Sequence, residues 1–280
     1  MAHSSLLSRL IPLRWRKSVP VVNLVRLHGA IGVGSPLKPP ITFKDINEVL
    51  EKAFRKGVAA VALSVNSPGG SAVQSALIHR RIRALAEEHK LPVYVFCEDV
   101  AASGGYWLAC AGDEIYADRS SVVGSIGVIS AGFGFVEAIG KLGIERRVHT
   151  AGESKSMLDP FQPEKAEDVG RLLAVQGDVH DAFKDLVRSR RGPKLKGTDD
   201  ELFSGAFWSG AQALDRGLID GLGHLHDVLR AKFGEKLVIR VISPPQGWGL
   251  RRLGFGAAGD ISDSFIASVE TRALWSRFGL

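Results

Sequence analysis

The first hundred residues alternate between two hydrophobic periods. Valine-rich apolar runs of strand length cover residues 19–27, 58–65 and 91–97, whereas residues 43–56 and 71–90 repeat their apolar side chains at helical spacing. Strands that alternate with amphipathic helices are typical of right-handed βαβ units, whose strands form a mainly parallel sheet. We therefore expect an α/β fold whose chemistry lies in loops at the carboxyl ends of the strands.

Later segments continue the alternation. Ser71 is in position to cap the 71–90 helix, and the side chains expected on its buried face are Val73, Leu77, Ile78, Ile82 and Leu85. Residues 144–149 (IERRVH) have a strand pattern, and residues 163–190 predict a helix long enough for subunit contacts, although such a helix ordinarily packs on the core.

The loop SPGG (67–70) follows a predicted strand. Pro68 fixes one torsion, while Gly69 and Gly70 allow conformations closed to other residues, so that backbone N–H groups can face outward before a helix. Such a turn can bind an oxyanion, although an isolated SPGG is more often a plain tight turn. The pattern alone leaves both interpretations open.

Ser103, in AASGG (101–105), is the candidate nucleophile. It lies where a strand is expected to give way to a helix, so the Gly104 N–H and the helix dipole would favour negative charge on a bound carbonyl oxygen. A serine in this position is ordinarily a helix N-cap. It becomes a nucleophile only if a base reaches its hydroxyl.

Histidine is the usual base for a serine, and eight are present. Only His28 and His149 follow predicted strands and would lie near the two loops. Neither has an Asp or Glu in an obvious relay position, which disfavours a Ser-His-Asp triad.

Lys155 is the alternative base, in the small-residue loop TAGESKSMLDPF (150–161). Most lysines are simply solvated, and a lysine base needs its pKa lowered from about 10.4 by roughly two to three units through burial. Glu153 must then point away, because a carboxylate would stabilise the charged amine. The side chains that would form a partly apolar pocket are Ser154, Ser156, Met157, Leu158 and Phe161.

Composition and charge narrow the class of protein. With 280 residues, 45% of them hydrophobic and 24% charged, the chain can bury a globular core. The net charge of +6 is partly concentrated in residues 1–18, a basic leader that is either disordered or lies on a membrane surface. No basic run with interleaved aromatic side chains follows, so we expect no nucleic-acid partner.

Cysteine usage and hydropathy narrow the class of protein further. Cys97 and Cys110 lie in apolar segments and are expected to be small core residues rather than members of a disulfide or metal cluster. Charged residues interrupt every apolar window before the roughly 18 residues that a membrane-spanning helix needs. We expect no spanning helix and no cleavable signal peptide, and a protein that is cytoplasmic or peripherally membrane-associated.

Four motifs, in this order and spacing, resemble the signal peptide peptidase A (SppA/SohB-like) family of serine peptidases. They are NSPGG (66–70), AASGGYWLA (101–109), GSIGV (124–128) and GESKSMLDPF (152–161), and jointly they are far more specific than any one alone. The resemblance covers roughly residues 19–235 and is to the short form, which has one copy of the motif set. It implies a ClpP/crotonase-like fold of repeated ββα units, with a mainly parallel sheet and flanking helices, over residues 19–243.

Carried over by position, the resemblance implies a Ser-Lys dyad. Ser103 would be the nucleophile and Lys155 the general base, and the oxyanion donors would be the backbone N–H groups of Gly69 and Gly104. Ser125 would orient the lysine amine, or else is a plain loop serine between glycines. No metal and no cofactor are implied. The implied substrates are extended peptides, such as signal-peptide remnants and misfolded or membrane-derived polypeptides.

The resemblance also implies a ring-shaped homo-oligomer in which neighbouring subunits can complete each site. Whether Ser103 and Lys155 come from one subunit stays open. Family members commonly begin with a transmembrane anchor, for which this sequence offers no candidate. Residues 244–280 form a tail with an amphipathic segment that would pack on a neighbour or a membrane. Two rival functions remain, a crotonase-like acyl-CoA enzyme and an inactive peptide-binding scaffold.

Overall fold

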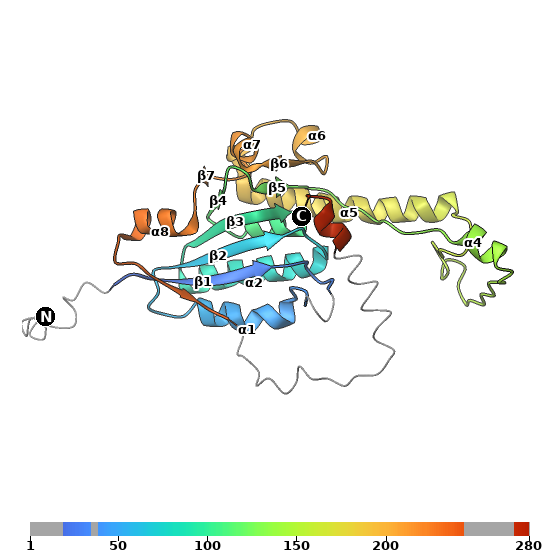
Figure 1. The fold of residues 1–280 in the computed structure, drawn as a ribbon, viewed down its shortest axis with the longest axis horizontal. Coiled ribbons are helices and arrows are strands. Elements are labelled where there is room, and N and C mark those ends of the chain that lie inside the picture. The colour runs from blue at the N-terminus through green and yellow to red at the C-terminus, as the bar shows by residue number, and fades with distance from the viewer. Residues whose placement is uncertain (1–18, 35–38, 244–271, 280) are drawn as a thin grey trace, which may run out of the picture.

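One mainly parallel sheet organises the molecule in the computed structural model, which describes residues 19–34, 39–243 and 272–279 (Figure 1). Its strand order is β6-β5-β3-β2-β1-β8, with β4 beside β3 and β7 beside β4, and β5–β6 is its antiparallel pair. The strands are β1 (Val21–His28), β2 (Ala60–Ser67), β3 (Val93–Ala102), β4 (Glu114–Ala117), β5 (Val122–Gly124), β6 (Phe207–Ser209), β7 (Gly221–Leu222) and β8 (Val238–Val241). The leader and residues 244–271 and 280 of the tail lie outside the described ranges, so the interpretations placed on them stay predictions.

Helices cover both faces of the sheet, which confirms the expected α/β class. They are α1 (Phe43–Ala53), α2 (Ala72–His89), α3 (Gly104–Ala109), α4 (Val136–Lys141), α5 (Ala166–Arg191), the 3-10 helix η3 (Gly192–Lys194), α6 (Asp199–Leu202), α7 (Gly210–Asp215) and α8 (Leu225–Phe233). The main core joins α1, α2 and α3 to one sheet face, and Leu229 of α8 packs on the other against Val22 and Leu24. The central strand β2 and most of β1 and β3 are buried on both sides, as parallel strands usually are, whereas β8 at the edge is largely exposed.

The predicted cap and most of the buried face of α2 are confirmed. Ser71 Oγ accepts a hydrogen bond from the Gln74 N–H at 3.3 Å. Val73 and Leu77, however, are 67% and 38% exposed, so their predicted burial was wrong. The buried face of α2 instead includes the polar residues Ser75 and His79. The remaining predicted core side chains are buried, namely Ile78, Ile82 and Leu85.

Both cysteines are buried and free, as expected for core residues. Burial raises the pKa of Cys97 to about 12 and that of Cys110 likewise to about 12. Both thiols are therefore protonated at neutral pH and poor nucleophiles.

The predicted strand at residues 144–149 is wrong. These residues pair with no strand among the described residues and are almost entirely exposed, because they belong to a projection away from the sheet (Figure 1). We define the arm as residues 128–179, which include α4 and the first half of α5. All of the arm is described, and none of its residues is buried.

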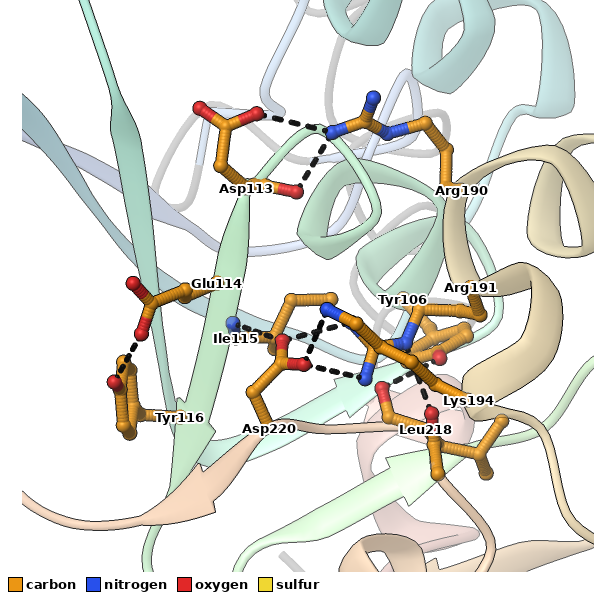
Figure 2. A network of polar contacts seen from close by, with 12 residues as sticks. Tyr106, Asp113, Glu114, Ile115, Tyr116, Arg190, Arg191, Lys194, Leu218 and Asp220 are labelled. Carbon is orange, nitrogen blue, oxygen red and sulfur yellow. Dashed lines mark hydrogen bonds and ion pairs between the residues drawn. The ribbon is translucent and has the colours of Figure 1, made fainter.

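The second half of α5 is anchored in the domain by aromatic stacking and by a buried ion pair, and Figure 2 shows the ion pair. Phe183 stacks on Trp107 of α3, with ring centroids 4.6 Å apart. Arg191, whose side chain is 2% exposed, donates to both carboxylate oxygens of Asp220 at 2.8 and 3.1 Å. Although burial opposes ionisation, the hydrogen bonds from Arg191 and Lys194 hold the pKa of Asp220 below its usual range. The arm therefore projects from a fixed base.

Candidate functional site

Ser103 lies between the end of β3 and the start of α3, where the sequence placed it. Its backbone has φ 52° and ψ −122°, a conformation that side-chain-bearing residues rarely adopt and that costs of order 1–3 kcal/mol. The pairing of β3 with β5 fixes this geometry, since the Ser103 N–H donates to the Gly124 carbonyl at 2.8 Å.

The Ser103 side chain does not act as a helix cap. Ser103 occupies the N-cap position of α3, but its hydroxyl accepts no capping hydrogen bond. The residue is only partly buried, and among the described residues its hydroxyl has no hydrogen-bond partner. The ordinary N-cap interpretation of this serine is therefore wrong, and the hydroxyl is free for other chemistry.

Gly69 packs directly against Ser103 and against Gly104, the next residue in the chain. A Cβ on Gly69, which has φ +102°, would be 2.7 Å from Ser103 Cβ and 2.9 Å from the Gly104 nitrogen. A Cβ on Gly104 would in turn lie 3.4 Å from Gly69 Cα. The glycines are required because the two backbones and the serine share one small space.

The two backbone N–H groups differ in their present partners. The Gly104 N–H belongs to the first residue of α3 and has no acceptor within the helix. The Gly69 N–H donates to Ser67 Oγ at 3.2 Å. Gly69 must exchange this partner before its N–H can stabilise a substrate oxyanion, a competition that the sequence did not reveal.

Ser125 also lies at this site, one residue beyond the β3–β5 pairing. Gly124 pairs with Ala102, so Ser125 and Ser103 leave neighbouring strands at the same edge. Ser125 is 6% exposed, has φ 53°, and donates its N–H to the Ala206 carbonyl at 2.7 Å. The structure thus brings together four of the five predicted site residues: Gly69, Ser103, Gly104 and Ser125.

Lys155 is the fifth, and within one chain it lies away from the other four. It occupies an exposed turn of the arm, so its own loop does not provide the burial that a lysine base needs. Arg171 donates to the hydroxyl of the adjacent Ser154, and Arg171 precedes Phe183 by twelve residues of α5, or about 18 Å of helix. Figure 1 shows the segment after α4 at the outer end of α5, away from the labelled strands β3 and β5. Glu153 is exposed and forms no ion pair with Lys155 within the described ranges.

A polar cluster on the opposite sheet face was missed from the sequence. His28 Nε2 lies 2.6 Å from Ser64 Oγ, which donates to Glu98, and the Glu98 carboxylate is 3.4 Å from the same ring nitrogen. An acid therefore does face His28, contrary to expectation. Ser64 is 1% exposed, and Glu98 contacts the same nitrogen as the serine, so the three do not form a triad. The sequence signal that could have revealed this cluster is that His28, Ser64 and Glu98 lie near the carboxyl ends of three neighbouring strands, where alternate residues point to the same sheet face.

A cavity of about 420 Å³ adjoins this cluster. Its lining includes Phe96, Glu98, Asp118, Ser121 and His224. No group of three or more His, Cys, Asp or Glu side chains in the described ranges is arranged to hold a metal ion.

Comparison with solved structures gives the class of fold. The 1510-N membrane-bound stomatin-specific protease, solved as a mutant with a substrate peptide, matches with a TM-score of 0.53 over 89% of this chain and 98% of that chain. The two sequences are 14% identical. The fold is thus ClpP-like, as the sequence motifs implied.

Comparison of sequences gives the family. The profile of Peptidase family S49 matches residues 86–237, more than half of the chain, and the protein belongs to this family. A Brucella abortus protein named Na(+)/H(+) antiporter NhaA is 51% identical over 98% of this chain. The Arabidopsis thaliana serine protease SPPA, chloroplastic, is 33% identical over 73% of it. The chain spans only 39% and 31% of the lengths of these relatives. In the ranges that the structure describes, no helix has the length and apolar character to cross a membrane.

Proposed function

We propose that the protein is a serine endopeptidase that uses Ser103 as nucleophile and Lys155 as general base. The observation that carries the proposal is the strained backbone of Ser103, whose hydroxyl makes no capping hydrogen bond and whose Cβ lies against Gly69. A conformation of this cost is retained where the surrounding structure enforces it, as it is at many functional sites. Membership of a peptidase family supports the same conclusion.

In the proposed reaction, the neutral amine of Lys155 takes the Ser103 proton as Oγ attacks the scissile carbonyl carbon. The Gly104 N–H, joined by the Gly69 N–H once it leaves Ser67 Oγ, stabilises the oxyanion. Lys155 then protonates the leaving amine, and water hydrolyses the acyl-enzyme by the reverse sequence. Ser125 accepts or donates one hydrogen bond to hold the lysine amine in line.

We propose further that Lys155 reaches Ser103 from a neighbouring copy in a homo-oligomer. Support comes from the arm, which holds Lys155 away from its own Ser103 and exposes several large apolar side chains. Those more than half exposed are Ile129, Phe133, Leu142, Ile144, Leu173 and Val175. Apolar side chains gathered on a projection are typical of a protein–protein contact.

The proposed substrates are extended peptides, including signal-peptide remnants and misfolded or membrane-derived polypeptides. Support comes from the relatives named as proteases and from the peptide bound to the stomatin-specific protease. The proposed setting is the cytoplasm or a membrane surface, with contact through the basic leader.

A casein hydrolysis assay of the wild type, Ser103→Ala and Lys155→Ala tests the dyad. Both variants are expected to lose at least about a thousandfold in kcat/KM, because neither group attacks an amide alone. Lys141→Ala, which removes an exposed lysine of the same arm, serves as the matched control and should stay near wild type. A fluorophosphonate should label the wild type and not Ser103→Ala.

Near-full activity in Lys155→Ala would contradict the dyad. An acyl-CoA activity that survives Ser103→Ala would favour the crotonase-like alternative. Absence of fluorophosphonate labelling in the assembled wild type would favour the inactive scaffold.

A further inference from the structure

The loop that carries Lys155 has no regular secondary structure to hold the lysine in place. Between Gly152 and Asp159 its backbone makes local turns, with the Lys155 N–H donating to the Gly152 carbonyl at 3.2 Å and the Asp159 N–H to that of Ser156 at 3.3 Å. Leu158 has φ 56°, so the loop also contains a strained residue. The position of Lys155 must therefore depend on the contacts made at the two ends of the loop.

Asp159 makes the strongest of these contacts. Its side chain is 6% exposed, although no residue of the arm is buried as a whole. Oδ2 accepts from Nε and Nη2 of Arg146 at 3.2 and 3.1 Å, and Oδ1 accepts from the Phe161 N–H at 3.0 Å. Both carboxylate oxygens are thus occupied, and a charge-assisted pair of this kind fixes orientation as well as adding stability.

Aromatic packing extends the contact to the rest of the arm. The Arg146 guanidinium lies over the Phe161 ring, 5.2 Å from its centroid, and Phe161 stacks on Phe135 at 5.5 Å. The Phe135 N–H donates to the Pro160 carbonyl at 2.6 Å. The carboxyl end of the loop is therefore joined to the segment before α4, while Arg171 of α5 holds the other end at Ser154.

We propose that Asp159, together with Arg146, is a positioning residue that sets the place of the Lys155 amine relative to the serine that it serves. The inference rests on the proposed dyad and deepens it. Asp159 lies four residues from Lys155 and touches no reacting atom, so it acts through the loop. Because the contact lies wholly within the arm, it operates whichever copy supplies Ser103.

Asp159→Asn tests the inference, since it keeps the shape of the side chain and removes the charge that Arg146 pairs with. The expected result is a fall of roughly 10- to 100-fold in kcat with KM within about twofold of wild type, because a misplaced base slows the chemical step without changing substrate binding. Glu145→Gln is the matched control, because it removes the exposed partner of the neighbouring Arg147. It should leave kcat within about twofold of the wild type.

Two further variants separate positioning from general damage to the arm. The exchange Arg146→Asp with Asp159→Arg should recover part of the kcat lost in Asp159→Asn, which simple loss of stability would not predict. Arg146→Lys keeps the charge but loses the two-donor fork, and it should also lower kcat with KM retained. If light scattering shows that Asp159→Asn forms smaller assemblies than the wild type, Arg146→Lys takes its place in the comparison with the wild type.

The inference would be overturned by a kcat near the wild-type value in Asp159→Asn, provided that this variant assembles. If it does not assemble, a kcat near the wild-type value in Arg146→Lys would overturn the inference instead. That outcome differs from failure of the proposed function, in which Lys155→Ala itself would remain active.

Discussion

At the scale of single residues, the site depends on backbone positions that only particular residues tolerate. Ser103 holds a strained conformation, and Gly69 leaves the space that a Cβ would take from Ser103 and from the Gly104 nitrogen. The sequence revealed the identity of these residues through their motifs. It could not reveal that Ser103 is uncapped or that Ser67 occupies the Gly69 N–H, because both depend on atomic geometry.

Gly69→Ala should abolish peptidase activity, with a loss of at least about 100-fold in kcat, because the new methyl group displaces Ser103 or the Gly104 amide. Gly57→Ala is the matched control. Gly57 has φ +90° with nothing within 4 Å of its Cβ position, so it should lose about 1 kcal/mol of stability from backbone strain alone and keep its activity. Urea denaturation and a casein assay on both variants make the comparison, and an active Gly69→Ala would contradict the arrangement.

His79 gives the fold a dependence on pH. Burial lowers the pKa of His79 from 6.5 to about 4. A hydrogen bond to the Cys110 carbonyl opposes this shift, and the nearby positive charges of Arg190, Arg83 and Arg80 add to it. Between these values the unfolded chain binds a proton that the folded protein does not. The free energy of unfolding should therefore be unaffected by His79 above pH 6.5 and fall by about 3 kcal/mol as pH drops to 4.

His79→Gln, which cannot titrate, measures this contribution. Urea denaturation of the variant between pH 7 and pH 4 should show a fall in stability smaller than that of the wild type by about 3 kcal/mol. Equal falls in the two proteins would show that His79 is protonated when folded.

At the scale of elements, hydrophobic period was a reliable guide wherever a segment packs on the sheet. It located β1, β2, β3 and α2, because each buries its apolar side chains against neighbours. It failed for residues 144–149, whose β-branched Ile144 and Val148 suggested a strand but which pair with no strand in the described part of the chain. The length of α5 was also predictable, whereas the exposure of its first half was not, because its apolar Leu173 and Val175 stay mostly exposed in the described part of the chain.

The buried pair of Arg191 and Asp220 fixes α5 and should be a major contributor to stability. Arg191→Met is expected to lower the free energy of unfolding by roughly 3–5 kcal/mol, because it leaves the Asp220 charge buried with a weaker set of partners. Lys194→Met removes a half-exposed partner of the same carboxylate and should cost about 1 kcal/mol or less. Urea denaturation at pH 7 distinguishes these values, and equal losses would contradict the dominant role of Arg191.

At the scale of the whole molecule, the domain and the arm hold different parts of one proposed site. Four site residues are fixed at the carboxyl edge of the sheet, and Lys155 is carried outward on a projection whose base is anchored by α5. This separation was not predictable from the spacing of the motifs, because the number of residues between two motifs does not determine how far apart they lie in the folded protein. It is the reason that we propose a site shared between copies of the chain.

Mixing two inactive variants is the most direct test of the shared site. Ser103→Ala supplies an intact lysine and Lys155→Ala an intact serine, so a randomly mixed 1:1 assembly should recover about one quarter of wild-type sites if each site combines neighbouring copies. Peptidase activity after the two variants are unfolded and refolded together, compared with each refolded alone, gives the measurement. Recovery near one quarter is the predicted result, and a mixed assembly that stays as inactive as its parents would contradict the account.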